Sequence, residues 1–162
     1  MDADTLLREE LLAVLRGGNA YMPFDRQVAD FPEADMNTCP PNVPYTPWHL
    51  LEHIRIGQND ILEFIRDPKY VSPEWPKGYW PASSEKADRA RWDETLRGFR
   101  TDMADLEAMV KDPATDLTAP IPHAPTYTIL REILLVADHN AHHLGEFAIL
   151  RQVMGTWPAA HS

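Results

Sequence analysis

Three histidines have the residue type and the spacing of a metal site. His139 and His143 are four residues apart in one helix-like stretch, and His53 lies in an earlier one. Residues four apart share a helix face with Cβ atoms about 6 Å apart, which lets two imidazoles bind one ion. Because Asn140 rather than a glutamate follows His139, the pattern is HxxxH without the HExxH signature, and a zinc-protease helix is not indicated.

Each of these histidines falls at the edge of an apolar helix face. At 100° per residue, His139 and His143 flank the apolar stripe of their helix, and His53 flanks the stripe of its own. Two facing helices would therefore aim the three side chains at one point. A single histidine in such a place is more often hydrogen-bonded than metal-bound, so the spacing alone leaves both interpretations open.

Several polar neighbours are alternative or supporting ligands. His49 and Asp60 lie on nearly the same helix face as His53 and are either outer-shell groups or alternative ligands. Three acidic residues beside the histidines either orient the imidazoles or are ordinary exposed helix charges, which is the favoured interpretation: Glu52, Asp138 and Glu146.

No catalytic base or nucleophile is indicated. The single cysteine, Cys39, has no neighbouring histidine, and the serines lie outside any nucleophile motif. The catalytic residues are therefore unknown at this stage. A lone cysteine cannot form an intrachain disulfide, which favours a reducing compartment.

Composition and charge exclude several classes of protein. Apolar residues make up 44% of the chain, enough for a packed core, and no apolar run approaches the roughly 18 residues of a membrane span. Residues 1–18 lack the basic start and unbroken apolar stretch of a signal peptide, so we expect a cytoplasmic protein. The net charge of −10 repels phosphate backbones and disfavours nucleic-acid binding.

Prolines divide the chain into segments that can be helical, because proline breaks helix interiors. Asp4 is the predicted N-cap of the first helix, and Thr46 followed by Pro47 predicts the start of the second. No alternating strand pattern is present, so sheet folds are disfavoured. We predict one all-α domain over residues 1–162, an up-down four-helix bundle with helices at about 4–16, 47–66, 84–111 and 126 or 128 to 155, and a short helix near 25–30.

The connection at residues 67–83 is long and rich in aromatic residues. Trp75, Tyr79 and Trp80 lie there among four prolines. They either line a pocket over the metal or anchor the loop to the bundle. Anchoring is favoured, because aromatic residues flanked by proline commonly hold loops by burial.

Three stretches of the chain are distinctive together: LLEHI within residues 48–55, the loop 75–81, and HNAxHLGE within 138–146. On these stretches the chain resembles the DinB-like superfamily of metal-binding four-helix bundles over almost its whole length. In that family's pattern, one histidine comes from the second helix and an HxxxH pair comes from the last helix. These positions correspond here to His53, His139 and His143.

Two positions depart from the family's pattern. His142 stands where many relatives carry an aromatic residue, and it is a competing ligand. Tyr21 lies in a segment where some relatives have a histidine, so any chemistry done by that histidine would fall to Tyr21 here.

The resemblance implies a divalent metal ion as cofactor, with zinc or nickel ahead of iron. Three neutral imidazoles leave coordination positions open, as catalytic sites do. The expected function is therefore a metal-dependent thiol transferase or hydrolase whose substrate is a low-molecular-weight thiol or another small molecule. A non-catalytic metal-binding or stress-response protein is the first alternative, and a dimeric helical scaffold with a vestigial site is the second. A homodimer is expected because related bundles often pair through helix faces.

Overall fold

A computed structural model describes residues 2–158. Two short 3-10 turns, η1 (Glu33–Asp35) and η2 (Lys77–Tyr79), and one hairpin of β1 (Pro120–Ile121) and β2 (Ala124–Thr128) connect the helices. The all-α prediction is confirmed. The described helices are α1 (Ala3–Arg16), α2 (Phe24–Val28), α3 (Pro47–Arg66), α4 (Arg89–Lys111) and α5 (Ile129–Met154).

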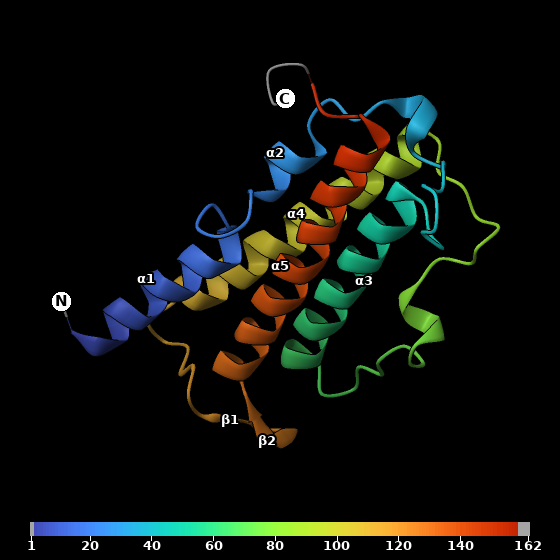
Figure 1. Cartoon of the computed structure of the whole chain (residues 1–162). Helices are drawn as coiled ribbons and strands as arrows, with labels where there is room; N and C mark the ends of the chain where they lie inside the picture. Colours follow the sequence, from blue (N-terminus) through green and yellow to red (C-terminus); the bar gives the residue numbers. More distant parts are fainter. Residues whose placement is uncertain (1, 159–162) are drawn as a thin grey trace.

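Helices α1, α3, α4 and α5 form the four-helix bundle (Figure 1). α3 packs against both α4 and α5, and α1 packs against the same two helices from the other side. α3 and α4 run in the same direction, whereas α5 runs opposite to α3. The order within the bundle is thus up, down, down, up, which corrects the predicted up-down order, because the connection 67–88 returns the chain along the side of α3 before α4 begins.

The start of α3 is fixed by two capping interactions. The hydroxyl of Thr46 accepts a hydrogen bond from the backbone N–H of His49 at 3.1 Å, and Nδ1 of His49 accepts one from the N–H of Thr46. Pro47 occupies the first helical position, where a missing N–H has no consequence. The predicted start at Thr46 and the predicted end at Arg66 are both confirmed.

Three local predictions are wrong. The N-cap of α1 is Asp2 rather than Asp4, because the Asp2 carboxylate accepts from the N–H of Thr5. α4 starts after Asp88 rather than at residue 84, because the Asp88 side chain accepts from the third N–H of the helix. The hairpin of β1 and β2 was not expected, since its strands are short and rich in proline.

The apolar core consists of two clusters stacked along the bundle. On α3 the first cluster ends at Ile54 and the second begins at Ile61, and on α5 the corresponding members are Leu144 and Ala137. The gap between the clusters holds the buried polar residues Gln58 and Asn140, with the histidines beside them. Within the described part of the chain, no helix combines the length and the apolar character that crossing a lipid bilayer requires.

Candidate metal centre

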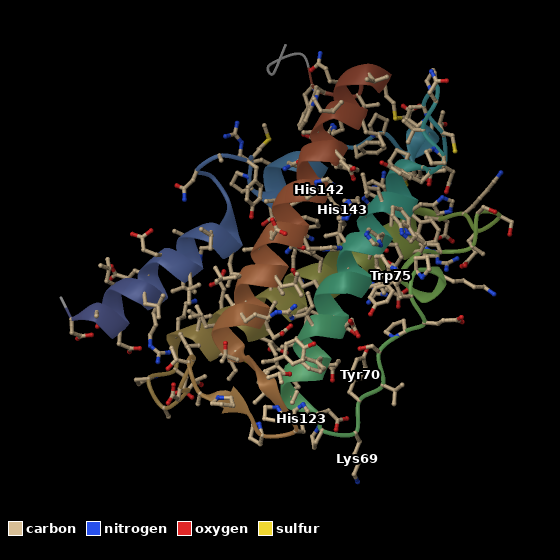
Figure 2. All side chains as sticks on the ribbon, turned by 60° about the horizontal axis from the view of Figure 1, so that its bottom comes forward. Lys69, Tyr70, Trp75, His123, His142 and His143 are labelled. Atoms are coloured by element: carbon tan, nitrogen blue, oxygen red, sulfur yellow. The ribbon has the colours of Figure 1, made fainter. Side chains whose placement is uncertain are left out.

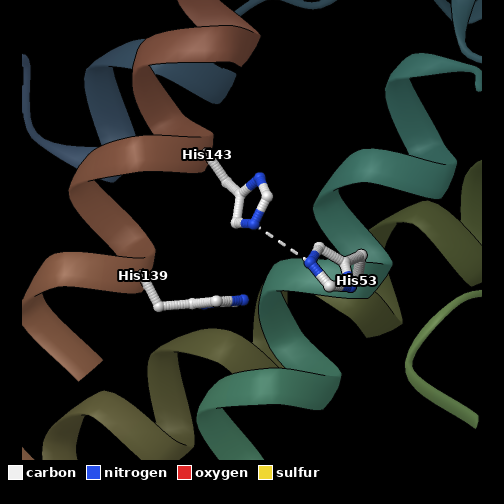
Figure 3. Close-up of side chains that lie close together, drawn as sticks. All are labelled: His53, His139 and His143. Carbon is white, nitrogen blue, oxygen red and sulfur yellow. Dashed lines mark hydrogen bonds between the residues drawn. The ribbon is translucent and has the colours of Figure 1, made fainter. Parts of the chain in front are cut away.

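The three predicted histidines come together between α3 and α5. His53 extends from α3, and His139 and His143 extend from α5 one turn apart (Figure 3). One ring nitrogen of each lies within 4.8 Å of those of the other two. The Nε2 atoms of His53 and His143 are 3.1 Å apart. The arrangement brings together the predicted set, and the role of these residues as ligands stays a prediction.

The remaining ring nitrogens of two histidines are held by acceptors. Nδ1 of His53 donates to the carbonyl oxygen of Tyr79 at 2.8 Å, and Nδ1 of His143 donates to Oε2 of Glu146 at 2.7 Å. A carbonyl oxygen can only accept, and a carboxylate accepts when ionised, so both Nδ1 atoms carry the hydrogen. Both Nε2 atoms are then left with lone pairs that face each other.

Two facing lone pairs at 3.1 Å require a proton or a cation between them. Burial lowers the pKa of His53, and it lowers the pKa of His139 to about 4, with a further contribution from the neighbouring imidazoles. Protonation of His53 and of His139 is therefore disfavoured. Two nitrogens on one tetrahedral zinc ion lie about 3.3 Å apart, close to the separation seen here, so the site fits a divalent cation.

Gly57 provides the space that the His139 ring occupies. A Cβ atom on Gly57 would lie 2.7 Å from Cε1 and 2.9 Å from Nε2 of His139, which is closer than side chains approach. Gly57 was not among the predicted site residues. A glycine inside a helix lowers the free energy of unfolding by about 1 kcal/mol relative to alanine. The presence of glycine at this position was therefore the sequence signal that packing or function requires it.

Two aromatic residues of the connection 67–88 hold the site, and one does not. The Trp80 ring stacks on His53 with centroids 3.9 Å apart, so it covers one face of that imidazole. The Tyr79 hydroxyl donates to Oδ2 of Asp60 at 2.8 Å. Trp75, by contrast, is 75% exposed, and its ring contacts that of Tyr79 edge to face with centroids 5.4 Å apart. Tyr79 thus anchors the connection to the bundle, whereas Trp80 covers the site.

Tyr79 links Asp60 to the candidate ligand His53, since its hydroxyl binds the first and its carbonyl the second. We expect Tyr79→Phe to weaken metal binding about tenfold, because the acceptor of the His53 Nδ1–H is no longer fixed. Isothermal titration with Zn²⁺ measures the change, with Tyr127→Phe on β2 as the matched control. Equal Zn²⁺ affinities for the two variants would show that the Tyr79 hydroxyl does not support the site.

Other predicted residues have structural roles. Both ring nitrogens of His49 are engaged, with Nδ1 in the α3 cap and Nε2 at 3.0 Å from the carbonyl oxygen of Glu85. Tyr21 donates its hydroxyl to the carbonyl oxygen of Val14 near the end of α1. Neither belongs to the three-histidine group.

Of the three acidic residues that could orient the histidines, one contacts a candidate ligand and two do not in the described part of the chain. Glu52 pairs with Arg55 at 2.6 Å and accepts from the hydroxyl of Thr95 on α4, so it joins two helices. Asp138 is exposed. Glu146, in contrast, contacts the candidate ligand His143 directly, as an outer-shell orienting residue does.

Fold and site together define an all-α bundle with a histidine cluster that could hold a metal ion. A sequence profile of the DinB superfamily matches residues 7–147, a range that contains all three histidines, and the chain belongs to this superfamily. No curated protein and no solved structure matched the chain.

Proposed function

We propose that this chain binds one divalent metal ion through Nε2 of His53, His139 and His143 and acts as a metal-dependent thiol transferase or hydrolase. The observation that carries the proposal is the 3.1 Å approach of two Nε2 atoms whose rings each donate from Nδ1. Membership of the DinB superfamily supports it as well.

The donor set favours zinc or nickel and an open coordination position. Imidazole nitrogen suits both ions, and three protein ligands are the number that catalytic zinc sites keep. A divalent ion in this site supplies Lewis-acid chemistry, which lowers the pKa of a coordinated water or thiol.

The surrounding residues fix the histidines and limit the access of water. Glu146 and the Tyr79 carbonyl hold the tautomers of His143 and His53, so that Nε2 of each ring points into the site. Stacking against Trp80 leaves His53 only 4% exposed. The His143 side chain is 15% exposed, so solvent reaches the edge of the site at α5.

Elemental analysis of the purified chain tests the metal site. We expect about one zinc or nickel ion per chain, and its loss in both His53→Ala and His139→Ala, because two imidazoles hold an ion far more weakly than three. His123→Ala is the matched control, since His123 lies at the far end of the bundle (Figure 2). A chain without metal whose stability is unaffected by a chelator would favour the scaffold alternative.

Catalysis is tested separately on the metal-loaded protein. Thiol-dependent transfer or hydrolysis that disappears in His139→Ala supports the enzymatic proposal. A bound ion without any such turnover, and with its fourth position filled by a protein ligand, supports the non-catalytic alternative.

A further inference from the structure

Glu146 contacts two histidines at once. Its Oε2 accepts from Nδ1 of His143 at 2.7 Å, and its Oε1 lies 3.4 Å from Nε2 of His142. The first distance is that of a charge-assisted hydrogen bond, whereas the second is longer. Nitrogen and oxygen ligands on one zinc ion lie about 3.4 Å apart, so His142 and Glu146 have the separation of two ligands of one cation.

His142 is open to solvent, unlike the three histidines of the inner site. The side chain of His142 is 66% exposed, that of His143 is 15% exposed, and His53 is 4% exposed. His142 and His143 are adjacent on α5 (Figure 2), and their ring centroids are 4.7 Å apart. The His143 ring is in turn 4.6 Å from those of His53 and His139, so the imidazoles form a continuous series from solvent to the interior.

We propose that His142 and Glu146 form an outer cation position that captures a divalent ion from solvent and passes it to the three-histidine site. His143 connects the two positions, because its Nδ1–H is hydrogen-bonded to Glu146 and its Nε2 faces His53. One ring nitrogen of each histidine and one carboxylate oxygen of Glu146 lie within 4.8 Å of one another. This inference rests on the proposed metal site and adds the route by which the ion reaches it.

An ordinary surface ion pair is the competing explanation for the contact between His142 and Glu146. Such pairs four residues apart on a helix contribute about 0.5 kcal/mol or less. An ion pair of that kind has no influence on metal binding, whereas the outer position determines how fast the ion is taken up. The net charge of −10 also raises the local concentration of cations around the exposed pair.

The test is the rate at which the metal-free chain takes up Co²⁺, followed by visible absorption after rapid mixing. We expect His142→Gln to slow uptake about tenfold, because it removes one of the two proposed outer ligands. Release into excess chelator slows as well, so the equilibrium affinity changes much less than the rates. His123→Gln is the matched control, and its rates should equal those of the unmodified chain.

Three results would overturn the inference. Uptake by His142→Gln at the unmodified rate would show that the outer contact is only a surface pair. A large loss of affinity without slower uptake would make His142 a ligand of the inner site instead. An unmodified chain that takes up no Co²⁺ or Zn²⁺ would contradict the proposed metal site itself, which distinguishes the two failures.

Discussion

Replacing Gly57 with alanine is expected to lower metal affinity by about 100-fold while the bundle stays folded. The added Cβ would lie within 3 Å of two His139 ring atoms, including Nε2. The ring is the end of a flexible side chain, so it turns away at little cost to the fold. In the helix interior, alanine is itself favoured over glycine by about 1 kcal/mol. Zn²⁺ titration and thermal unfolding of the metal-free protein measure the two effects.

Gly145→Ala is the matched control for this variant. Gly145 lies inside α5 two residues after His143, and nothing is within 4 Å of the Cβ that alanine would add. We expect unchanged metal affinity and a gain in the free energy of unfolding of about 0.5–1 kcal/mol. Undiminished affinity in Gly57→Ala would mean that His139 does not need its present position to bind the ion.

Acidification should destabilise the metal-free protein because of His139. Its pKa is lowered from 6.5 to about 4 by burial and by the adjacent imidazoles. Between these two values the unfolded chain binds a proton that the folded chain does not, so the free energy of unfolding decreases as the pH falls. This contribution is complete above about pH 6.5 and is lost towards pH 4, with a size of about 1–3 kcal/mol.

Urea unfolding at pH 7.0, 6.0, 5.0 and 4.5, roughly spanning the interval above, measures this dependence with a chelator present. Carboxylates contribute at the acid end, since the Arg16 guanidinium and Lys111 lower the pKa of Glu107 to about 2. His139→Gln retains those carboxylates and removes the imidazole, so the difference between the two proteins isolates His139. Parallel curves for both proteins would show that His139 titrates as it does in the unfolded chain.

Much of the fold could be predicted because its signals are local. The boundaries of α3 follow from Thr46, Pro47 and the Asp67–Pro68 break, each of which acts within one turn. The start of α4 was harder, because residues 84–88 are compatible with helix and only the bond from Arg91 N–H to Asp88 selects the start. The parallel course of α3 and α4 depends on how the connection 67–88 packs, which no local pattern encodes.

The candidate site was likewise predictable only where its signals are local in sequence. Helical periodicity put His139 and His143 on one face and His53 at the edge of another, and the structure brings these residues together. Two of their supporting contacts come from residues distant in sequence. The Tyr79 carbonyl reaches His53 only because the connection folds back, and Gly57 matters only because α5 packs against it.

X-ray absorption spectroscopy of the metal-loaded protein tests most directly whether three imidazoles share one ion. The predicted spectrum contains three imidazole nitrogens at about 2.0–2.1 Å from zinc, with an oxygen atom as any remaining ligand. His53→Ala should reduce the imidazole count by one in any ion that is retained. A spectrum with a single imidazole, or one that is unchanged in His53→Ala, would contradict a site shared between α3 and α5.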